Sequence, residues 1–577
     1  RMVDWAWEEE DNSYLSNESI LLTSITLSWF LTSSNRFLRD SATKALVNLL
    51  QNRIDVLKKL LEKFSEVNDI YVLERLYAVA YGCALRTTHK QDLKELSIYI
   101  YNQIFNKEYV IPHILLRDYA RGVIEYTLTF DSSLPIDVSR IRPPYKNQWN
   151  RNEVLEDIDV SKYRFDYKSE NFQPHYWSQN EILSSMATTS SGDYGDFGRY
   201  VFESAFSPWE DLDVKKLSNW AIKRVFELGY DVEKHGEFDR SASRYGDGGR
   251  SGRKAERIGK KYQWIAFYEL LALVSDSFPM YDDDYNSWNK IKVNYEGPWN
   301  PYVRDIDPTL LIRKTRVEKE GISSWWIPVN YSSWELDNDE WVQSTDDLPQ
   351  PDKFLLVKDE YGNEWFVLES YPEWSEPKKL GEDKWERTYK RLWYQFRSYL
   401  VPQYGYKKLY YWLSEQNFMG RWMPEAESKY QIFSREYYWS PAYRYFRNGD
   451  WVNIFDKDND LIKGKGVITT EHFLWEEEYD CSKSDSISFI IPSGYIVKGM
   501  NLEFGYKEGQ FTDKHGDLIC FDPSVYKDTI SCLLIKKDKF LDFLKQNKLK
   551  IIWTFLGEKH IIGRHTTNQW LELFGAY

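Results

Sequence analysis

The residues best suited to chemistry form a basic strip, residues 250–261, which follows a run of glycines and precedes a helical pattern. Six basic side chains stand against one glutamate there, a net charge of +5 over twelve residues. A glycine-rich loop that enters a helix presents backbone N–H groups, which suit an anion. We therefore expect contact with a phosphate, a nucleic acid or the acidic surface of a partner; the alternative is that these cations pair with neighbouring carboxylates. The cations are Arg250, Arg253, Lys254, Arg257, Lys260 and Lys261.

The segment Tyr331–Asp352 offers a second candidate site. It holds seven acidic residues and no basic one, with Trp334 and Trp341 between them. Tryptophan is enriched among the residues that dominate the energetics of protein interfaces, so an exposed tryptophan flanked by carboxylates is typical of a recognition loop. We therefore predict that Trp334 and Trp341 bind a partner; the alternative is that both rings anchor a solvated loop to the core.

Catalytic motifs do not accompany these candidates. The sequence contains no GxxxxGK[ST] phosphate loop, no HExxH zinc helix and no GxSxG nucleophile turn. Its four cysteines and eight histidines show no zinc-type spacing, and we expect the cysteines to be reduced and buried. Glycoside hydrolysis needs two carboxylates across a cleft, and 89 acidic residues leave such a pair undefined. No catalytic residue, metal ligand or cofactor is assigned to this chain, and the sequence does not decide whether it is an enzyme.

Consecutive amphipathic helices are predicted over residues 1–130. In Phe37–Leu50 the apolar residues recur on one face of a 3.6-residue helix. The sequence of Leu38–Ala42 (LRDSA) returns as Leu116–Ala120 (LRDYA), 78 residues later. Two repeats of about 40 residues fit that offset and predict HEAT-like helical repeats. Such repeats stack helix pairs and leave a long open flank for a partner.

The rest of the chain divides into three regions. Residues 131–210 predict an irregular connector, because prolines and a Ser/Gly-rich run interrupt the periodicity. Residues 211–280 predict a helical segment that carries the basic, glycine-rich loop. Residues 281–577 predict an aromatic-rich mixed α/β region. The elements expected there are hairpins over 353–370 and 508–521, a helix over 385–400, and a strand, a helix and a strand over 531–557. The expected fold class is therefore α+β, with an N-terminal HEAT-like α-solenoid, a helical segment and a Trp-rich mixed domain.

Composition and charge disfavour some classes of protein. With 42% hydrophobic and 28% charged residues, the balance is that of a soluble globular chain. The formal charge of −14 disfavours a globally basic nucleic-acid binder. The longest apolar run, Ile20–Leu31, is too short to span a bilayer, and no secretory leader opens the chain. We therefore expect a cytoplasmic protein without a membrane partner.

Several stretches resemble a known family, the C-terminal region of large bacterial STAND-type NTPases, in particular the NACHT-like, Avs-type antiphage sensors. The resemblance covers most of the chain and is clearest before residue 275. In that family an N-terminal effector and a central ATPase precede a helical-repeat sensor, which binds a phage protein and drives oligomerisation. The resemblance implies that this chain is the sensor region, that ATP and Mg²⁺ belong to an upstream domain, and that no catalytic residue is carried over. The stretches are FLTSSNRFLRDSATKALVNLL, VNDIYVLERLYAVAYGCAL, LLRDYARGVIEY, GDFGRYVF and GRSGRKAERIGKKYQWIAFYELLA.

The leading hypothesis is a macromolecular recognition module that binds a protein partner. If the resemblance holds, the partner is a phage structural or packaging protein, and the full-length protein forms a homo-oligomer. One alternative is a carbohydrate-active enzyme with a Trp-lined cleft and paired carboxylates. Another is a nucleic-acid binder that uses the basic strip.

Overall fold

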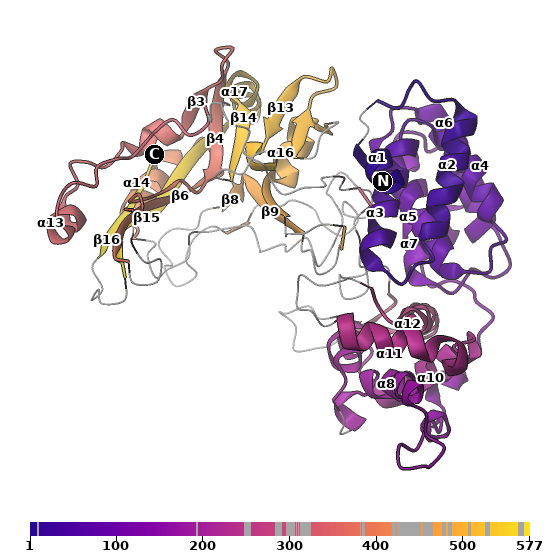
Figure 1. Ribbon diagram of the computed structural model, residues 1–577. Coiled ribbons are helices and arrows are strands. Elements are labelled where there is room, and N and C mark those ends of the chain that lie inside the picture. Colours follow the sequence, from indigo (N-terminus) through magenta and orange to yellow (C-terminus); the bar gives the residue numbers. More distant parts are fainter. Residues whose placement is uncertain are drawn as a thin grey trace. The chain divides into compact units, whose positions relative to one another are not determined.

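The computed structural model in Figure 1 contains helices and antiparallel sheet, which confirms the α+β class. The chain forms two compact units. The first comprises Arg1–Arg313, Ile432–Tyr445 and Glu476–Asp485, and the second comprises Lys314–Gln431, Phe446–Trp475 and Ser486–Tyr577. The first unit thus continues beyond residue 281, where the sequence changes character. The structure describes residues 1–8, 11–191, 194–246, 255–282, 291–295, 306, 308, 309, 311, 325–380, 382, 387–417, 423, 452–453, 465–475, 481–482, 487–505, 509–525, 531–563 and 570–577.

The described part of residues 1–128 forms α-helices that stack in two layers (Figure 1). Helices α1, α3, α5 and α7 pack on one another in succession and form the inner layer, and α2, α4 and α6 form the outer layer. Outer helix α4 buries one apolar face, whereas α3 and α5 are buried on nearly all sides. The helices are α1 (Met2–Glu8), α2 (Asn17–Phe30), α3 (Arg36–Leu50), α4 (Ile54–Phe64), α5 (Ile70–Arg86), α6 (Lys90–Ile100, continued by a π-helical turn, Tyr101–Phe105) and α7 (Ile114–Leu128).

The repeated sequence LRD marks equivalent places in α3 and α7. Arg39 in α3 and Arg117 in α7 both donate to a carbonyl oxygen of the connection that precedes their helix, at Leu31 and Ile111 respectively. In each case the arginine holds that connection against the first turn. A repeated sequence thus produces a repeated local contact at the start of these two helices.

The described remainder of the first unit is a long segment with short helical turns, residues 129–176, followed by a second group of helices. Helix α12 packs on α7, α8, α10 and α11. Gly229 follows α10 with a φ of 101°, which glycine adopts without strain. The helices are α8 (Trp177–Ser185), α9 (Ser204–Phe206), α10 (Val214–Glu227), α11 (Val232–Gly246) and α12 (Ile258–Ser277). The helical turns before α8 are Val138–Arg140, Arg151–Leu155, Ser161–Tyr163 and Pro174–Tyr176, and those between α8 and α9 are Thr189–Ser191 and Phe197–Glu203.

The second unit is built on one large antiparallel sheet. Its strand order over the described residues is β11-β12-β13-β14-β4-β6-β15-β16, with β3 beside β4, and β5 and β8 beside β6. The strands are β3 (Leu356–Lys358), β4 (Glu364–Ser370), β5 (Glu373–Ser375), β6 (Tyr389–Pro402), β7 (Val452–Asn453), β8 (Lys465–Ile468), β11 (Glu503–Phe504), β12 (Gln510–Thr512), β13 (Leu518–Phe521), β14 (Cys532–Lys536), β15 (Leu549–Ile562) and β16 (Trp570–Ala576). Separate pairs are β1 (Met280–Asp282) with β2 (Ile291–Val293), and β9 (Thr470–Trp475) with β10 (Ile487–Pro492). Short helices accompany the sheet: α13 (Asn338–Gln343), α14 (Tyr406–Ser414), α16 (Gly494–Gly499), α17 (Lys537–Gln546) and the turns Pro351–Phe354 and Pro523–Val525.

Three sequence-based predictions for this unit are confirmed, and one is wrong. The hairpins β3–β4 and β12–β13 and the succession β14, α17, β15 lie where the patterns placed them. The helix predicted over 385–400 is wrong, because residues 389–402 form β6. Leu392, Tyr394 and Phe396 are buried at every second position, and β6 pairs with β15 along its whole length. Aromatic residues occur on both faces of β6, at Trp393 as well as at Tyr394 and Phe396, so a 3.6-residue stripe appears beside the strand alternation that the structure adopts.

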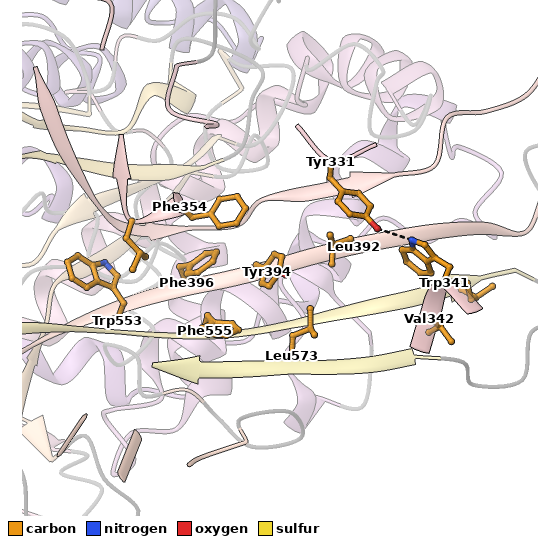
Figure 2. Packing of buried hydrophobic residues seen from close by; sticks show 12 residues of the cluster. Tyr331, Trp341, Val342, Phe354, Leu392, Tyr394, Phe396, Trp553, Phe555 and Leu573 are labelled. Carbon is orange, nitrogen blue, oxygen red and sulfur yellow. Dashed lines mark hydrogen bonds between the residues drawn. The ribbon is translucent and has the colours of Figure 1, made fainter. Parts of the chain in front are cut away.

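An aromatic cluster covers one end of this sheet (Figure 2). Tyr394 and Phe396 of β6 lie beside Phe555 of β15, with ring centroids 5.7–6.1 Å apart. Trp341 of α13 closes the cluster and donates its indole N–H to the hydroxyl oxygen of Tyr331 at 2.8 Å. The core of the second unit therefore joins the sheet to the acidic loop, Tyr331–Asp352.

A buried lysine fixes this attachment. The Lys559 ammonium lies 4.7 Å from the centre of the Trp341 ring and donates to the carbonyl oxygens of Trp341 and Ser344 and to the Asp347 carboxylate. Burial lowers the pKa of Lys559, and the Asp347 charge opposes that effect. The lysine thus replaces the water that these loop groups would otherwise bind.

Replacing Lys559 with methionine tests the attachment. Lys559→Met leaves two carbonyl oxygens and the Asp347 carboxylate without their donor, so the free energy of unfolding of the second unit should fall by about 3 kcal/mol in urea denaturation. Lys550→Met, on an exposed side chain of the same strand, is the matched control and should change it by less than about 0.5 kcal/mol. Equal effects of the two substitutions would contradict this account.

Candidate functional site

The described cations of the basic strip are engaged in ion pairs. Arg257 lies 3.3 Å from a carboxylate oxygen of Glu181, and Lys260 lies 2.8 Å from one of Glu256. Lys261 contacts the Asp69 carboxylate at 2.7 Å. These contacts favour the alternative in which the cations pair with neighbouring carboxylates. Arg250, Arg253 and Lys254 lie outside the described residues.

The helix start within the strip, at Ile258, already holds an anion. Asp239 of α11 accepts hydrogen bonds from the backbone N–H groups of Ile258 and Gly259, the first residues of α12, and from the hydroxyl of Tyr230. Burial raises the pKa of Asp239, and these hydrogen bonds oppose the rise. Two N–H groups of the predicted anion site, those of Ile258 and Gly259, are therefore occupied by the protein's own carboxylate, and the glycine-rich loop itself lies outside the described residues.

The acidic loop uses its tryptophans to attach to the sheet. Trp341 is fully buried, so its ring cannot meet a partner, and Trp334 is half-buried against it. Lys390 of β6 donates to the carbonyl oxygens of Trp334 and Leu336. The burial of Trp341 and these lysine contacts favour the anchoring alternative over partner binding.

Four charged side chains of α3 and α5, the inner-layer ion network, form a site that the motifs did not indicate. Arg39 contacts Glu74 at 3.1 Å, and Arg75 contacts Asp40 at 3.0 Å and Glu74 at 3.2 Å. All four are at most 1% exposed. Two positive and two negative charges balance, which such burial requires. The repeat LRDSA contains Arg39 and Asp40, yet sequence alone did not show that they face inward.

Short stretches of distant chain lie on the inner layer beside this network. Ile306 accepts from the Tyr119 hydroxyl of α7, Thr309 from the Arg86 guanidinium of α5, and Leu311 from the Trp7 indole of α1, in each case through the backbone carbonyl. The backbone N–H of Cys481 donates to Asp40 at 3.0 Å. Nothing in the periodicity of either stretch signals these contacts, because they join residues 187 to 441 positions apart.

Another buried polar cluster lies in the second unit, and we call it the Glu369 cluster. The Glu369 carboxylate of β4 is 1% exposed and accepts from Tyr371, Thr470 and His472, the last at 2.7 Å. Arg397 of β6 lies 3.5 Å away. Burial alone would raise the pKa of Glu369, but the charges of His472 and Arg397 and the hydrogen bonds hold it at about 2. A carboxyl group held ionised in this way cannot serve as the general acid of a glycosidase.

The described residues contain no group of three or more His, Cys, Asp and Glu side chains that could hold a metal ion. All four cysteines are free and buried, as expected for Cys83, Cys481, Cys520 and Cys532. Among the described helices, none has the length and apolarity needed to cross a membrane.

Comparison with known proteins adds no relative. No protein-family model matches the sequence. A search of curated proteins likewise finds no significant match.

The Glu369 cluster predicts a pH dependence of stability. A carboxyl group whose pKa is lowered to about 2 in the folded chain, from 4.5, stabilises the fold above about pH 4.5 and loses that contribution as the pH falls to 2. Glu369→Gln should therefore be less stable than the parent at pH 6, and the difference should shrink by about 3 kcal/mol by pH 2 in denaturant titrations.

The matched control is Glu373→Gln on the neighbouring strand β5, where the exposed pair with Arg391 contributes less than about 1 kcal/mol. The free energy of unfolding of this control should change with pH in the same way as that of the parent. A gap between Glu369→Gln and the parent that stays constant with pH would contradict the assignment.

Proposed function

We propose that this chain is a macromolecular recognition module whose stacked helices form a HEAT-like α-solenoid that binds a protein partner. Support comes from the alternation of α1 to α7 between two layers and from the repeated arginine contacts of α3 and α7. Solenoids of this kind use long faces built from successive helices to bind extended partners. The aromatic-rich second unit supplies a further surface for recognition.

The observation that carries this proposal is how the inner layer holds backbone from a distant part of the chain. Tyr119, Arg86 and Trp7 come from three different helices, and each donates to a carbonyl oxygen at 2.9–3.3 Å. Carbonyl oxygens are common to every polypeptide, so side chains placed in this way suit a protein ligand. The same donors do not provide the apolar pocket that a small-molecule site needs.

The wider proposal follows from the sequence resemblance. The module is the sensor region of a bacterial antiviral STAND-type NTPase, it acts in the cytoplasm, and it binds a phage structural or packaging protein. Binding then drives oligomerisation of the larger protein. ATP and Mg²⁺ belong to the upstream ATPase, and no cofactor is assigned to this chain.

Capture from infected cells tests the proposal. The tagged chain is expressed in bacteria with benzoylphenylalanine at position 37 or at position 29, irradiated during phage infection, purified and examined by mass spectrometry. Phe37 on α3 and Trp29 on α2 are matched aromatic residues, 50% and 52% exposed, in the inner and outer layers. A phage protein should be recovered at least tenfold above uninfected cells, with more crosslinking from position 37. Recovery of no phage protein above background from either position would refute it.

A further inference from the structure

We propose that the outward face of α2 binds a second copy of this chain, with the two α2 helices antiparallel across a two-fold axis. The face, which we call the apolar stripe, consists of Leu22, Ile25, Thr26 and Trp29. The inference rests on the proposed function, because it gives the oligomerisation proposed there a surface and a partner.

The apolar stripe is exposed, although the opposite face of α2 is buried in the helical unit. Leu22 is 59% and Trp29 is 52% exposed, whereas Ile20 and Leu27 are fully buried. Leu22, Thr26 and Trp29 follow one another at intervals of four and three residues, so they lie in one line along the helix. Helix α2 is therefore apolar on both faces, whereas a helix with one side in water normally has a polar face there.

The neighbouring helix α4 shows how an ordinary solvated face is built. Helices α2 and α4 pack against each other in the outer layer (Figure 1). The sequence from Ser19 to Asn35 contains no charged residue. The exposed face of α4, by contrast, carries charged residues at Asp55, Lys59, Glu62 and Lys63. Because both helices lie in the same layer, the exposed hydrocarbon of α2 indicates an interaction surface.

The apolar stripe is prepared for burial before any contact is made. The hydroxyl of Thr26 donates to the carbonyl oxygen of Leu22 at 3.1 Å, so burying this side chain leaves no hydroxyl hydrogen without an acceptor. The Trp29 ring rests on Phe64 of α4, with ring centroids 5.2 Å apart. A ring that is already held in place loses little conformational freedom when a second surface covers it.

Charge selects a second copy as the occupant of this face. The chain has a formal charge of −14, so two copies repel each other unless they meet at an uncharged surface. The apolar stripe is such a surface, and it can meet its own copy without placing like charges together. A strongly charged partner would gain no attraction from it.

The spacing of the stripe fits a two-fold axis. With the axis between Ile25 and Thr26, Leu22 and Trp29 lie equally far from it on either side. Each Trp29 ring then covers Leu22 of the second copy, so the same patch serves both copies, as an isologous contact requires. Thr26 is small and lies at the axis, which lets the two helices approach closely.

The one charged residue of α2 favours the antiparallel arrangement. A parallel pair would place Glu18 beside Glu18 of the second copy, and the two carboxylates would repel each other. In the antiparallel pair Glu18 lies opposite the uncharged residues Thr32–Asn35. The direction of the helices therefore follows from the placement of this glutamate.

The size of the stripe determines how strong the contact is. A few side chains on one helix bury less than the roughly 800 Å² per partner that stable complexes bury. Self-association of the isolated chain is therefore weak and depends on concentration. In a larger assembly that holds copies together, the same contact gains from their high effective concentration.

A charge pair tests both the contact and its direction. In sedimentation velocity runs on the purified chain, Trp29→Glu should weaken self-association at least tenfold, because it places a carboxylate against Leu22 of the second copy. Adding Leu22→Lys should restore association, since each lysine then faces a glutamate across the axis. Gln91→Glu, at an exposed position of α6, is the control with the same added charge and should behave like the parent. Circular dichroism checks that every variant keeps its helices.

A monomeric parent at all concentrations would overturn the proposal. Failure of Leu22→Lys to restore association of Trp29→Glu would overturn the antiparallel arrangement. Weakening by Gln91→Glu as strong as that by Trp29→Glu would also overturn it, because the effect would then come from net charge.

Disulfide trapping detects the contact even when association is weak. All four native cysteines are buried, so an introduced cysteine is the accessible one. Thr26→Cys places thiols of two copies near the axis and should form a disulfide-linked dimer at least tenfold faster than Lys59→Cys, at an exposed position of α4. Adding Trp29→Glu should remove that advantage. Equal rates for Thr26→Cys and Lys59→Cys would refute the contact.

These measurements use the purified chain without phage, so their failure leaves the capture of a phage protein to be judged separately. Conversely, a chain that self-associates through α2 and captures no phage protein would retain the contact and contradict the proposed function. In the capture experiment, benzoylphenylalanine at position 29 should give crosslinked dimers of the chain before infection. A crosslink to a different protein in place of these dimers would overturn the assignment to a second copy.

Discussion

The balance of buried charge between α3 and α5 is the constraint on which the helical unit depends. Arg39, Asp40, Glu74 and Arg75 are withdrawn from water, so each must find its opposite on the neighbouring helix. This requirement fixes the rotation of α3 against α5 more tightly than apolar packing does, because a slipped helix would leave an unpaired charge. It also determines what can cover the inner layer, since the cover must supply polar groups such as the N–H of Cys481.

The same principle recurs in the second unit with other residues. Lys559 and Lys390 reach from two adjacent strands to carbonyl oxygens of an acidic loop, and the loop in turn closes the aromatic cluster. Asp239 performs the opposite task in the first unit, where a carboxylate meets the backbone N–H groups of a helix start. In each of these places a buried charged side chain forms the hydrogen bonds that water would otherwise make with a helix end or a loop. Several features that resemble ligand sites in sequence thus serve to hold the protein together.

Local sequence patterns predicted much of the fold but few of the contacts at the candidate sites. The apolar stripe of Phe37–Leu50 and the repeat at Leu116 predicted α3 and α7, because amphipathic periodicity is a local property. Strand β6 was mistaken for a helix, because aromatic residues on both faces obscure the period. The contacts of Ile306 and Cys481 join residues far apart in sequence, and the role of Asp239 depends on the approach of α11 to α12. Such contacts arise from tertiary structure, which spacing within one segment does not encode.

The distance in sequence between the inner layer and its cover has a consequence for synthesis. Helix α7 is complete at Leu128, whereas Cys481 follows 353 residues later. At about 5–20 residues per second, Asp40 lacks its donor from Cys481 for roughly 20–70 s after α7 is complete, and Ile306 to Leu311 are added to the chain within that interval. A nascent polypeptide or chaperone close to the exit tunnel thus meets this surface earlier than the protein's own later residues can.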